Sequence, residues 1–259
     1  MLPADVAKRP ALPPSAELTL SAPESQGNVV TAFRYHARQM LINSARVALL
    51  ADFLAHRFGL QPVLQRWMAE TPMAHATLLM GKGLFDEQQP GFVGTYSAGA
   101  SSDDVRQAIE EADTTICVGT QFVDTLTAGF TQQLALERTI EVQPQASRVG
   151  GTWFSGLSME QAVTTLRELC LELSIAPPPA KPATAQPHIE KGPLTQENFW
   201  HTVQQALASG DLILADQGTA AFGAASLSLP TGAELIVQPL WGSIGYSLPA
   251  AFGAQTAAP

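Results

Sequence analysis

The feature that most constrains the fold is a series of short, continuous apolar runs that alternate with segments of helical spacing. Four such runs are found, at residues 47–50, 76–80, 115–118 and 139–142. The segments with helical spacing lie at residues 60–69, 103–112 and 159–173, and Ser158 is expected to cap the last of them. Continuous apolar runs are typical of strands that are buried on both faces of a parallel sheet. The alternation therefore predicts an α/β fold with a doubly wound parallel sheet over residues 26–176.

Prolines mark the boundaries of a second unit. Residues 1–25 are rich in proline and predict an extended connector, and residues 177–193 contain six prolines in seventeen positions, which predicts an exposed linker. The second unit, residues 194–259, begins with a helix at 196–208 that Thr195 is expected to cap. Phe199, Val203 and Leu207 are expected to form the apolar stripe of this helix. Two short strands at 212–214 and 235–237 and a helix at 247–257 follow, and the first strand is expected to be buried on both faces. These elements predict a second α/β unit that is truncated.

Charge and cysteine usage exclude several classes of protein. The net charge of −9 and the pI near 4.9, without any run of basic residues, argue against a nucleic-acid or membrane-surface partner. Cys117 and Cys170 are isolated from each other and from possible ligands, so they are expected to be buried free thiols in a reducing cytoplasm. The five histidines are dispersed, which argues against a metal cluster and favours surface or capping roles.

The stretch 211–246 carries two strand ends followed by loops of small residues, ADQGTAAFG and PLWGSIGY. Such strand ends lie side by side at the carboxyl edge of a parallel sheet, where open α/β folds bind ligands. The pair of loops resembles the thiamine-diphosphate-dependent 2-oxo acid decarboxylases, in particular the indolepyruvate/phenylpyruvate decarboxylase branch. The segments LLMGKGLFDEQQPGFVGTYSAGAS and CVGTQFVDTLTAGF strengthen the resemblance. The family's fold implies a central domain followed by the first part of the cofactor-binding domain.

The resemblance implies a role for individual residues of both loops. Gly218 and Thr219 would hold the diphosphate, and Gly242 would offer its carbonyl to the aminopyrimidine amino group. Ser243 belongs to the same cofactor loop, and Ile244 would be the apolar wedge that bends the cofactor, which brings that amino group close to the reacting carbon. The residues expected to face the substrate are Gln217, Ala221, Phe222 and Thr125.

The family's reaction is the decarboxylation of an aromatic 2-oxo acid, such as indolepyruvate or phenylpyruvate, to an aldehyde and CO₂. It requires thiamine diphosphate and Mg²⁺, and the family forms homodimers or homotetramers. The Mg²⁺ ligands are expected outside this chain, because the family's GDG motif is absent from the sequence. The glutamate that activates the cofactor is expected in an upstream domain. No catalytic residue is therefore assigned here, and the chain alone is expected to be inactive.

Two other functions stay open at this point. One is a non-catalytic scaffold or interaction module, and the other is an FAD- or nucleotide-binding central domain like that of related carboligases.

Gly81-Lys82-Gly83 lacks the spacing of a phosphate-binding P-loop. The adjacent carboxylates at 86–87 and 103–104 are expected to be solvated charges.

Overall fold

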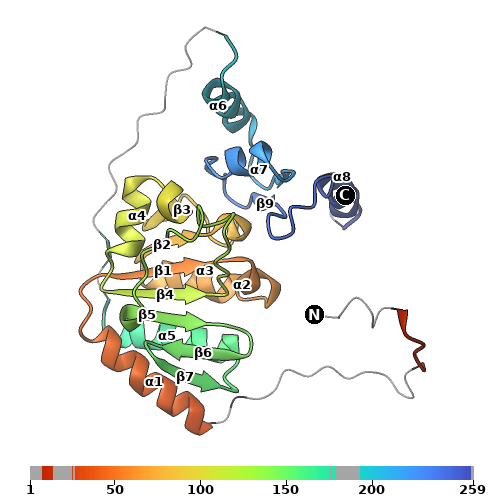
Figure 1. Cartoon of the computed structure of the whole chain (residues 1–259). Helices are drawn as coiled ribbons and strands as arrows, with labels where there is room; N and C mark the ends of the chain where they lie inside the picture. Colours follow the sequence, from red (N-terminus) through yellow and green to blue (C-terminus); the bar gives the residue numbers. More distant parts are fainter. Residues whose placement is uncertain (1–7, 14–24, 26, 176, 179–192, 258–259) are drawn as a thin grey trace.

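The computed structural model describes residues 8–13, 25, 27–175, 177–178 and 193–257, and its strands form two sheets (Figure 1). The seven strands of the larger sheet are β1 Val47–Ala51, β2 Ala74–Thr77, β3 Phe92–Thr95, β4 Thr114–Val118, β5 Thr139–Val142, β6 Ala146–Val149 and β7 Thr152–Ser155. The helices around it are α1 Gly27–Leu41, α2 Phe53–Arg57, α3 Gln61–Glu70, α4 Asp103–Glu110 and α5 Met159–Glu172. The predicted α/β fold is confirmed.

The order of the strands places a topological switch point in the middle of the sheet. The order is β3-β2-β1-β4-β5-β6-β7, and the pairs from β3 to β5 are parallel (Figure 1). The chain runs from β1 outward to β2 and β3 and then returns to the other side of β1 to form β4. The carboxyl ends of β1 and β4 therefore border the kind of crevice where open α/β sheets bind ligands.

The two faces of the sheet are covered by different helices, because successive residues of a strand point to opposite faces. Val47, Leu49 and Ala51 of β1 belong to a core cluster with α1, α3 and α5. Ala48 and Leu50 belong to a second cluster with α4. All five residues of β1 are buried. This double burial explains why the sequence of the strand is apolar throughout rather than alternating.

Two helix starts follow directly from the sequence. The Ser158 hydroxyl accepts a hydrogen bond from the Gln161 N–H at 3.2 Å, and the Thr195 hydroxyl accepts one from the Asn198 N–H at 3.1 Å. Each side chain thereby satisfies one of the N–H groups that a helix leaves unpaired in its first turn. Both predicted caps are confirmed.

The second unit consists of a small sheet and three helices, α6 Gln196–Ala206, β8 Leu212–Leu214, α7 Thr219–Ala224, β9 Glu234–Ile236 and α8 Ser247–Ala257. Strands β8 and β9 pair in parallel, with Ile213 opposite Leu235. Its core cluster includes Leu79 and Leu126 of the larger domain. The second unit thus packs against the larger domain near β2 and β3 (Figure 1).

Several local predictions differ from the structure. The run predicted as a strand at 76–80 is strand only to Thr77, and Leu79–Gly81 forms a 3₁₀ turn in which Gly81 lies against the backbone of Asp52. Strands β6 and β7 were not predicted, and they pair antiparallel with β5 and with each other. Their polar residues hide the pattern, since this edge hairpin is covered on one face only.

Two predictions for the second unit are also wrong in detail. Leu212 is 38% exposed, so β8 is not buried on both faces, because a sheet of two strands has little to cover it. In α6, Phe199 is 44% exposed, and Trp200 packs with Val203 and Leu207 against the core instead. Most of the predicted connector 1–25 and linker 177–193 lies outside the described residues.

Candidate functional site

The two loops singled out in the sequence meet in the structure through Asp216. One Asp216 carboxylate oxygen, Oδ2, accepts a hydrogen bond from the Gly245 N–H at 2.8 Å, and the other, Oδ1, accepts one from the Gln217 N–H at 2.9 Å. The Asp216 carbonyl accepts a further bond from the Ala221 N–H. This side chain therefore ties the loop after β9 to the start of α7. Asp216 was not among the site residues predicted from the sequence, although an aspartate two residues after a strand and two before a glycine is a usable signal.

Gly218 and Thr219 form the entrance to α7. Gly218 has φ 113° and ψ −146°, a conformation that is essentially restricted to glycine, and no heavy atom lies within 4 Å of the position that a Cβ would occupy. Thr219 is exposed beside it. The turn is thus not packed against other atoms on the side where a Gly218 side chain would lie.

The second loop presents Gly242, Ser243 and Ile244 at the surface. All three are exposed, and the Ile244 side chain is 81% exposed. The Gly242 carbonyl accepts a hydrogen bond from the Ile244 N–H at 2.9 Å and keeps a second lone pair, as any backbone carbonyl does. Ile244 is therefore an exposed apolar side chain on a tight turn.

The residues expected to face the substrate occupy different environments. Phe222 and Thr125 line the same cavity of about 980 Å³, which lies between the larger domain and α7. Gln217 is partly buried, and its Oε1 atom has no hydrogen-bond partner in the structure. Ala221 is fully buried in the core cluster of the second unit. The structure thus brings two of the four residues together in one cavity, Thr125 from the larger domain and Phe222 from α7.

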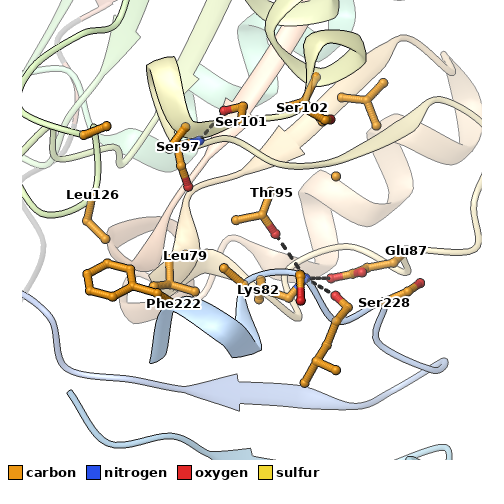
Figure 2. A pocket seen from close by; sticks show the side chains of 18 of the residues that line it. Leu79, Lys82, Glu87, Thr95, Ser97, Ser101, Ser102, Leu126, Phe222 and Ser228 are labelled. Atoms are coloured by element: carbon orange, nitrogen blue, oxygen red, sulfur yellow. Dashed lines mark hydrogen bonds and ion pairs between the residues drawn. The ribbon is translucent and has the colours of Figure 1, made fainter. Parts of the chain in front are cut away.

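The cavity has an apolar end and a charged end. Figure 2 shows Phe222 with Leu79 and Leu126 at one end, and Lys82 with Glu87 at the other. Serine hydroxyls contribute much of the polar lining, among them those of Ser97 and Ser228. The cavity can accordingly take an organic molecule that has an apolar body and a polar group.

Two titratable residues correct expectations from the sequence, and Lys82 agrees with its expectation. The Glu87 side chain is buried and paired with Lys82 rather than solvated. His75 is fully buried, with its Nδ1 2.8 Å from the Met73 carbonyl oxygen, and burial lowers the pKa of His75 to about 4. It is a neutral core residue, not a surface histidine. Lys82 binds protein acceptors with all three ammonium protons, which leaves none for a phosphate.

Asp52 is an unexpected buried carboxyl at the switch point. It follows β1 directly, is fully buried, and neither side-chain oxygen has a hydrogen-bond partner in the structure. Burial raises the pKa of Asp52 to about 7, although the nearby N–H groups of Phe53 and Gln121 oppose this rise. No sequence pattern predicts this, because an aspartate after a strand is usually solvated.

The cysteines are free and buried, as expected, and burial raises the pKa of each thiol to about 12. Within the part of the chain that the structure describes, no three His, Cys, Asp or Glu side chains are grouped so that they could hold a metal ion. No helix among the described residues has the length and apolarity needed to cross a membrane.

Comparison with known proteins identifies the family. The family model described as thiamine pyrophosphate enzyme, central domain, matches residues 35–169. The whole chain is 40% identical to an alpha-keto-acid decarboxylase of Mycobacterium avium (strain 104) and 38% identical to one of Mycobacterium ulcerans (strain Agy99), and it covers 46% of each. The chain spans about half the length of these relatives. It belongs to the thiamine pyrophosphate enzyme family, with residues 35–169 as the central domain.

Proposed function

We propose that this chain is part of a thiamine-diphosphate-dependent decarboxylase of aromatic 2-oxo acids of the indolepyruvate or phenylpyruvate type. The observation that carries the proposal is the contact between Asp216 and Gly245, which joins the two loops assigned to the cofactor. The similarity to alpha-keto-acid decarboxylases over the full length of the chain supports the reaction class. The aromatic preference is supported by Phe222 and Leu126 at the apolar end of the cavity.

The residues of this chain would bind and orient the cofactor rather than transfer protons. Gly218 and Thr219 would hold the diphosphate, with Mg²⁺ bound by ligands from elsewhere in the enzyme. Gly242 and Ser243 would lie beside the aminopyrimidine ring of the cofactor, and Ile244 would keep the cofactor bent. When bound, thiamine diphosphate supplies the electron sink that makes loss of CO₂ possible. Phe222 and Thr125 would contact the substrate, with Gln217 nearby and Ala221 in the wall behind them.

The proposal extends to the cellular location and the oligomeric state of the enzyme. A cytoplasmic location fits two free, buried cysteines. A homodimer or homotetramer fits the large apolar side chains that the second unit exposes, notably Trp241, Leu248 and Phe252.

An assay with indolepyruvate, phenylpyruvate and pyruvate, in the presence of thiamine diphosphate and Mg²⁺, tests the substrate class. Turnover of pyruvate alone would contradict the aromatic preference.

The Thr219→Val and Ile244→Ala variants test the assignment of the two loops. Replacing Thr219 removes a hydrogen bond to a charged group, so we expect thiamine diphosphate affinity to fall roughly tenfold or more. Replacing Ile244 removes the wedge but no diphosphate contact, so affinity should be nearly unchanged. Turnover, measured in a protein of the relatives' full length, should then fall on the order of a hundredfold, because a small displacement of reacting groups is costly.

Calorimetric titration with thiamine diphosphate and steady-state kinetics measure the two effects separately. Ile42→Ala is the matched control, because Ile42 is also an exposed isoleucine, at 50%, but directly follows α1, outside both loops and outside the second unit. Equal losses of affinity and turnover in the two loop variants would show that the loops are wrongly assigned.

A further inference from the structure

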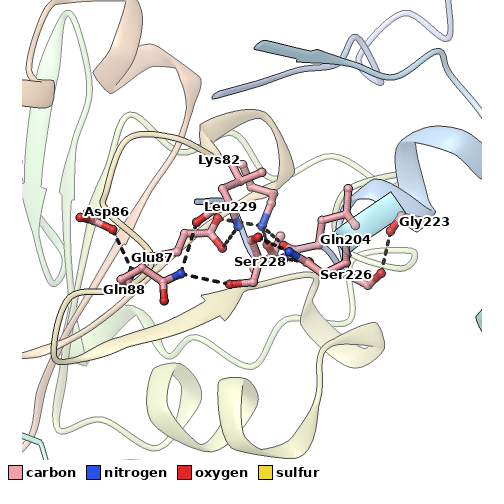
Figure 3. A network of polar contacts seen from close by, with 11 residues as sticks. Lys82, Asp86, Glu87, Gln88, Gln204, Gly223, Ser226, Ser228 and Leu229 are labelled. Carbon is pink, nitrogen blue, oxygen red and sulfur yellow. Dashed lines mark hydrogen bonds and ion pairs between the residues drawn. The ribbon is translucent and has the colours of Figure 1, made fainter. Parts of the chain in front are cut away.

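Lys82 and Glu87 form a buried ion pair at the contact between the two units (Figure 3). The distance between Lys82 Nζ and Glu87 Oε1 is 2.8 Å, and the two side chains are only 2% and 4% exposed. Burial lowers the pKa of Lys82, and the charge of Glu87 opposes this change. Both residues belong to the connection between β2 and β3, so the pair is built entirely by the central domain.

The pair binds the backbone of one short segment of the second unit. Lys82 Nζ donates to the Leu227 carbonyl at 2.8 Å, and Glu87 Oε2 accepts from the Leu229 N–H at 3.0 Å (Figure 3). The third ammonium proton goes to the Thr95 hydroxyl at 3.1 Å. A cation thus holds a carbonyl and an anion holds an N–H two residues later. The two charges match the polarity of the backbone that they contact.

Other contacts secure the same segment from both units. From the central domain, Gln88 Nε2 lies 3.4 Å from the Leu229 carbonyl oxygen, and Asp86 accepts from the Thr231 hydroxyl at 3.2 Å. From α6, the Gln204 amide bonds both the N–H and the carbonyl of Ser228, at 2.7 and 2.8 Å. The segment Leu227–Leu229 is therefore a fixed point between the two units.

This fixed point lies immediately after α7. The Leu227 N–H donates to the Ala224 carbonyl at 3.2 Å, and Leu227 and Leu229 are buried beside the helix. Helix α7 has only six residues, so its position depends on what holds its two ends. Asp216 holds the end that carries Gly218 and Thr219, and Lys82 with Glu87 holds the other.

We propose that Lys82 and Glu87 are positioning residues, which fix α7 on the central domain and thereby place the turn at Gly218 and Thr219 for diphosphate binding. The last step rests on the proposed function, whereas the fixing of α7 does not. A buried ion pair often adds little stability compared with apolar residues of the same volume. What it contributes here is a defined geometry, since each charge has one backbone partner in the second unit.

The full chain tests this with Lys82→Met, Glu87→Gln and the double variant. Hydrogen exchange reports on the amides of residues 219–229, and titration of a protein of the relatives' full length with thiamine diphosphate and Mg²⁺ reports on the site. Each single variant leaves one buried charge without its partner, so we expect exchange at 219–229 to accelerate about a hundredfold or more, with weaker cofactor binding. Exchange in β1 should change much less than exchange at 219–229.

The double variant separates positioning from charge compensation. Removing both charges should restore the melting temperature, but not the slow exchange at 219–229 or the cofactor affinity, because methionine cannot donate to the Leu227 carbonyl. The control is Glu141→Gln, which breaks the 2.8 Å ion pair of Glu141 with Arg148 between β5 and β6. It should leave exchange at 219–229 unchanged.

Two outcomes would overturn the inference. One is a double variant that regains both slow exchange at 219–229 and cofactor affinity. Lys82 and Glu87 would then only neutralise each other's charge, and neither would position α7. The other is unchanged exchange at 219–229 in Lys82→Met. A parent protein of the relatives' full length that binds no thiamine diphosphate would instead contradict the proposed function, and hydrogen exchange would still decide whether Lys82 and Glu87 position α7.

Discussion

Replacing Asp52 by asparagine is expected to raise the free energy of unfolding above pH 7 by on the order of 4 kcal/mol. The pKa of this carboxyl is about 7 in the folded protein and 3.8 for an unperturbed aspartate. Below pH 3.8 the group is protonated in both states and carries no penalty. As the pH rises towards 7, the unfolded chain ionises while the folded protein does not, so stability is lost progressively. Asparagine does not ionise and avoids this loss.

Urea unfolding between pH 4 and pH 8.5 measures this difference. The Asp52→Asn variant and the parent should be similarly stable near pH 4 and should diverge up to about pH 7. Asp104→Asn is the control, because Asp104 is exposed in the first turn of α4. Parallel curves for Asp52→Asn and the parent would show that Asp52 is ionised in the folded protein and has a partner that stabilises its charge.

Replacing Gly119 by alanine is expected to destabilise the protein by roughly 2–5 kcal/mol. Gly119 follows β4 at the switch point, with φ +62°. A Cβ atom there would lie 2.5 Å from the backbone nitrogen of Ala55 and 2.9 Å from the Cβ of Leu54. Because a backbone atom of α2 cannot move without moving β1, the clash cannot be relieved locally.

Gly156→Ala is the matched control for this substitution. Gly156 has a similar φ of +74°, but no heavy atom lies within 4 Å of the Cβ position. It should therefore show only the conformational cost of about 1–2 kcal/mol. Urea midpoints at an unchanged m-value provide the comparison. Equal destabilisation by both substitutions would mean that the close approach of β4 and α2 does not constrain residue 119.

The sequence alone determined the features that depend on residues close together in the chain. The apolar runs of β1 and β4 are strands because both faces of each are buried, and burial of both faces leaves a continuous pattern in the sequence. The caps at Ser158 and Thr195 were predictable because a cap acts within three residues. The glycine loops indicated the family because their residues are adjacent in the chain.

The candidate site was predictable only in part, for the same reason. The resemblance selected Gly218, Thr219 and Ile244, and their assignment to the cofactor stays a prediction. It did not select Asp216, although this residue joins the two loops over a separation of 29 residues. The side chains that line the cavity come from both units, so no single stretch of sequence contains the information that defines it.

Only the tertiary structure decided how the charged residues behave. Lys82 reaches Leu227 across 145 residues of sequence, and that contact makes a buried positioning group of a lysine to which the sequence assigned no role. The raised pKa of Asp52 depends on burial at a crevice that exists only after β4 has paired with β1. Burial and long-range pairing set the energy of a charge, and neither leaves a periodic signal in the residues around it.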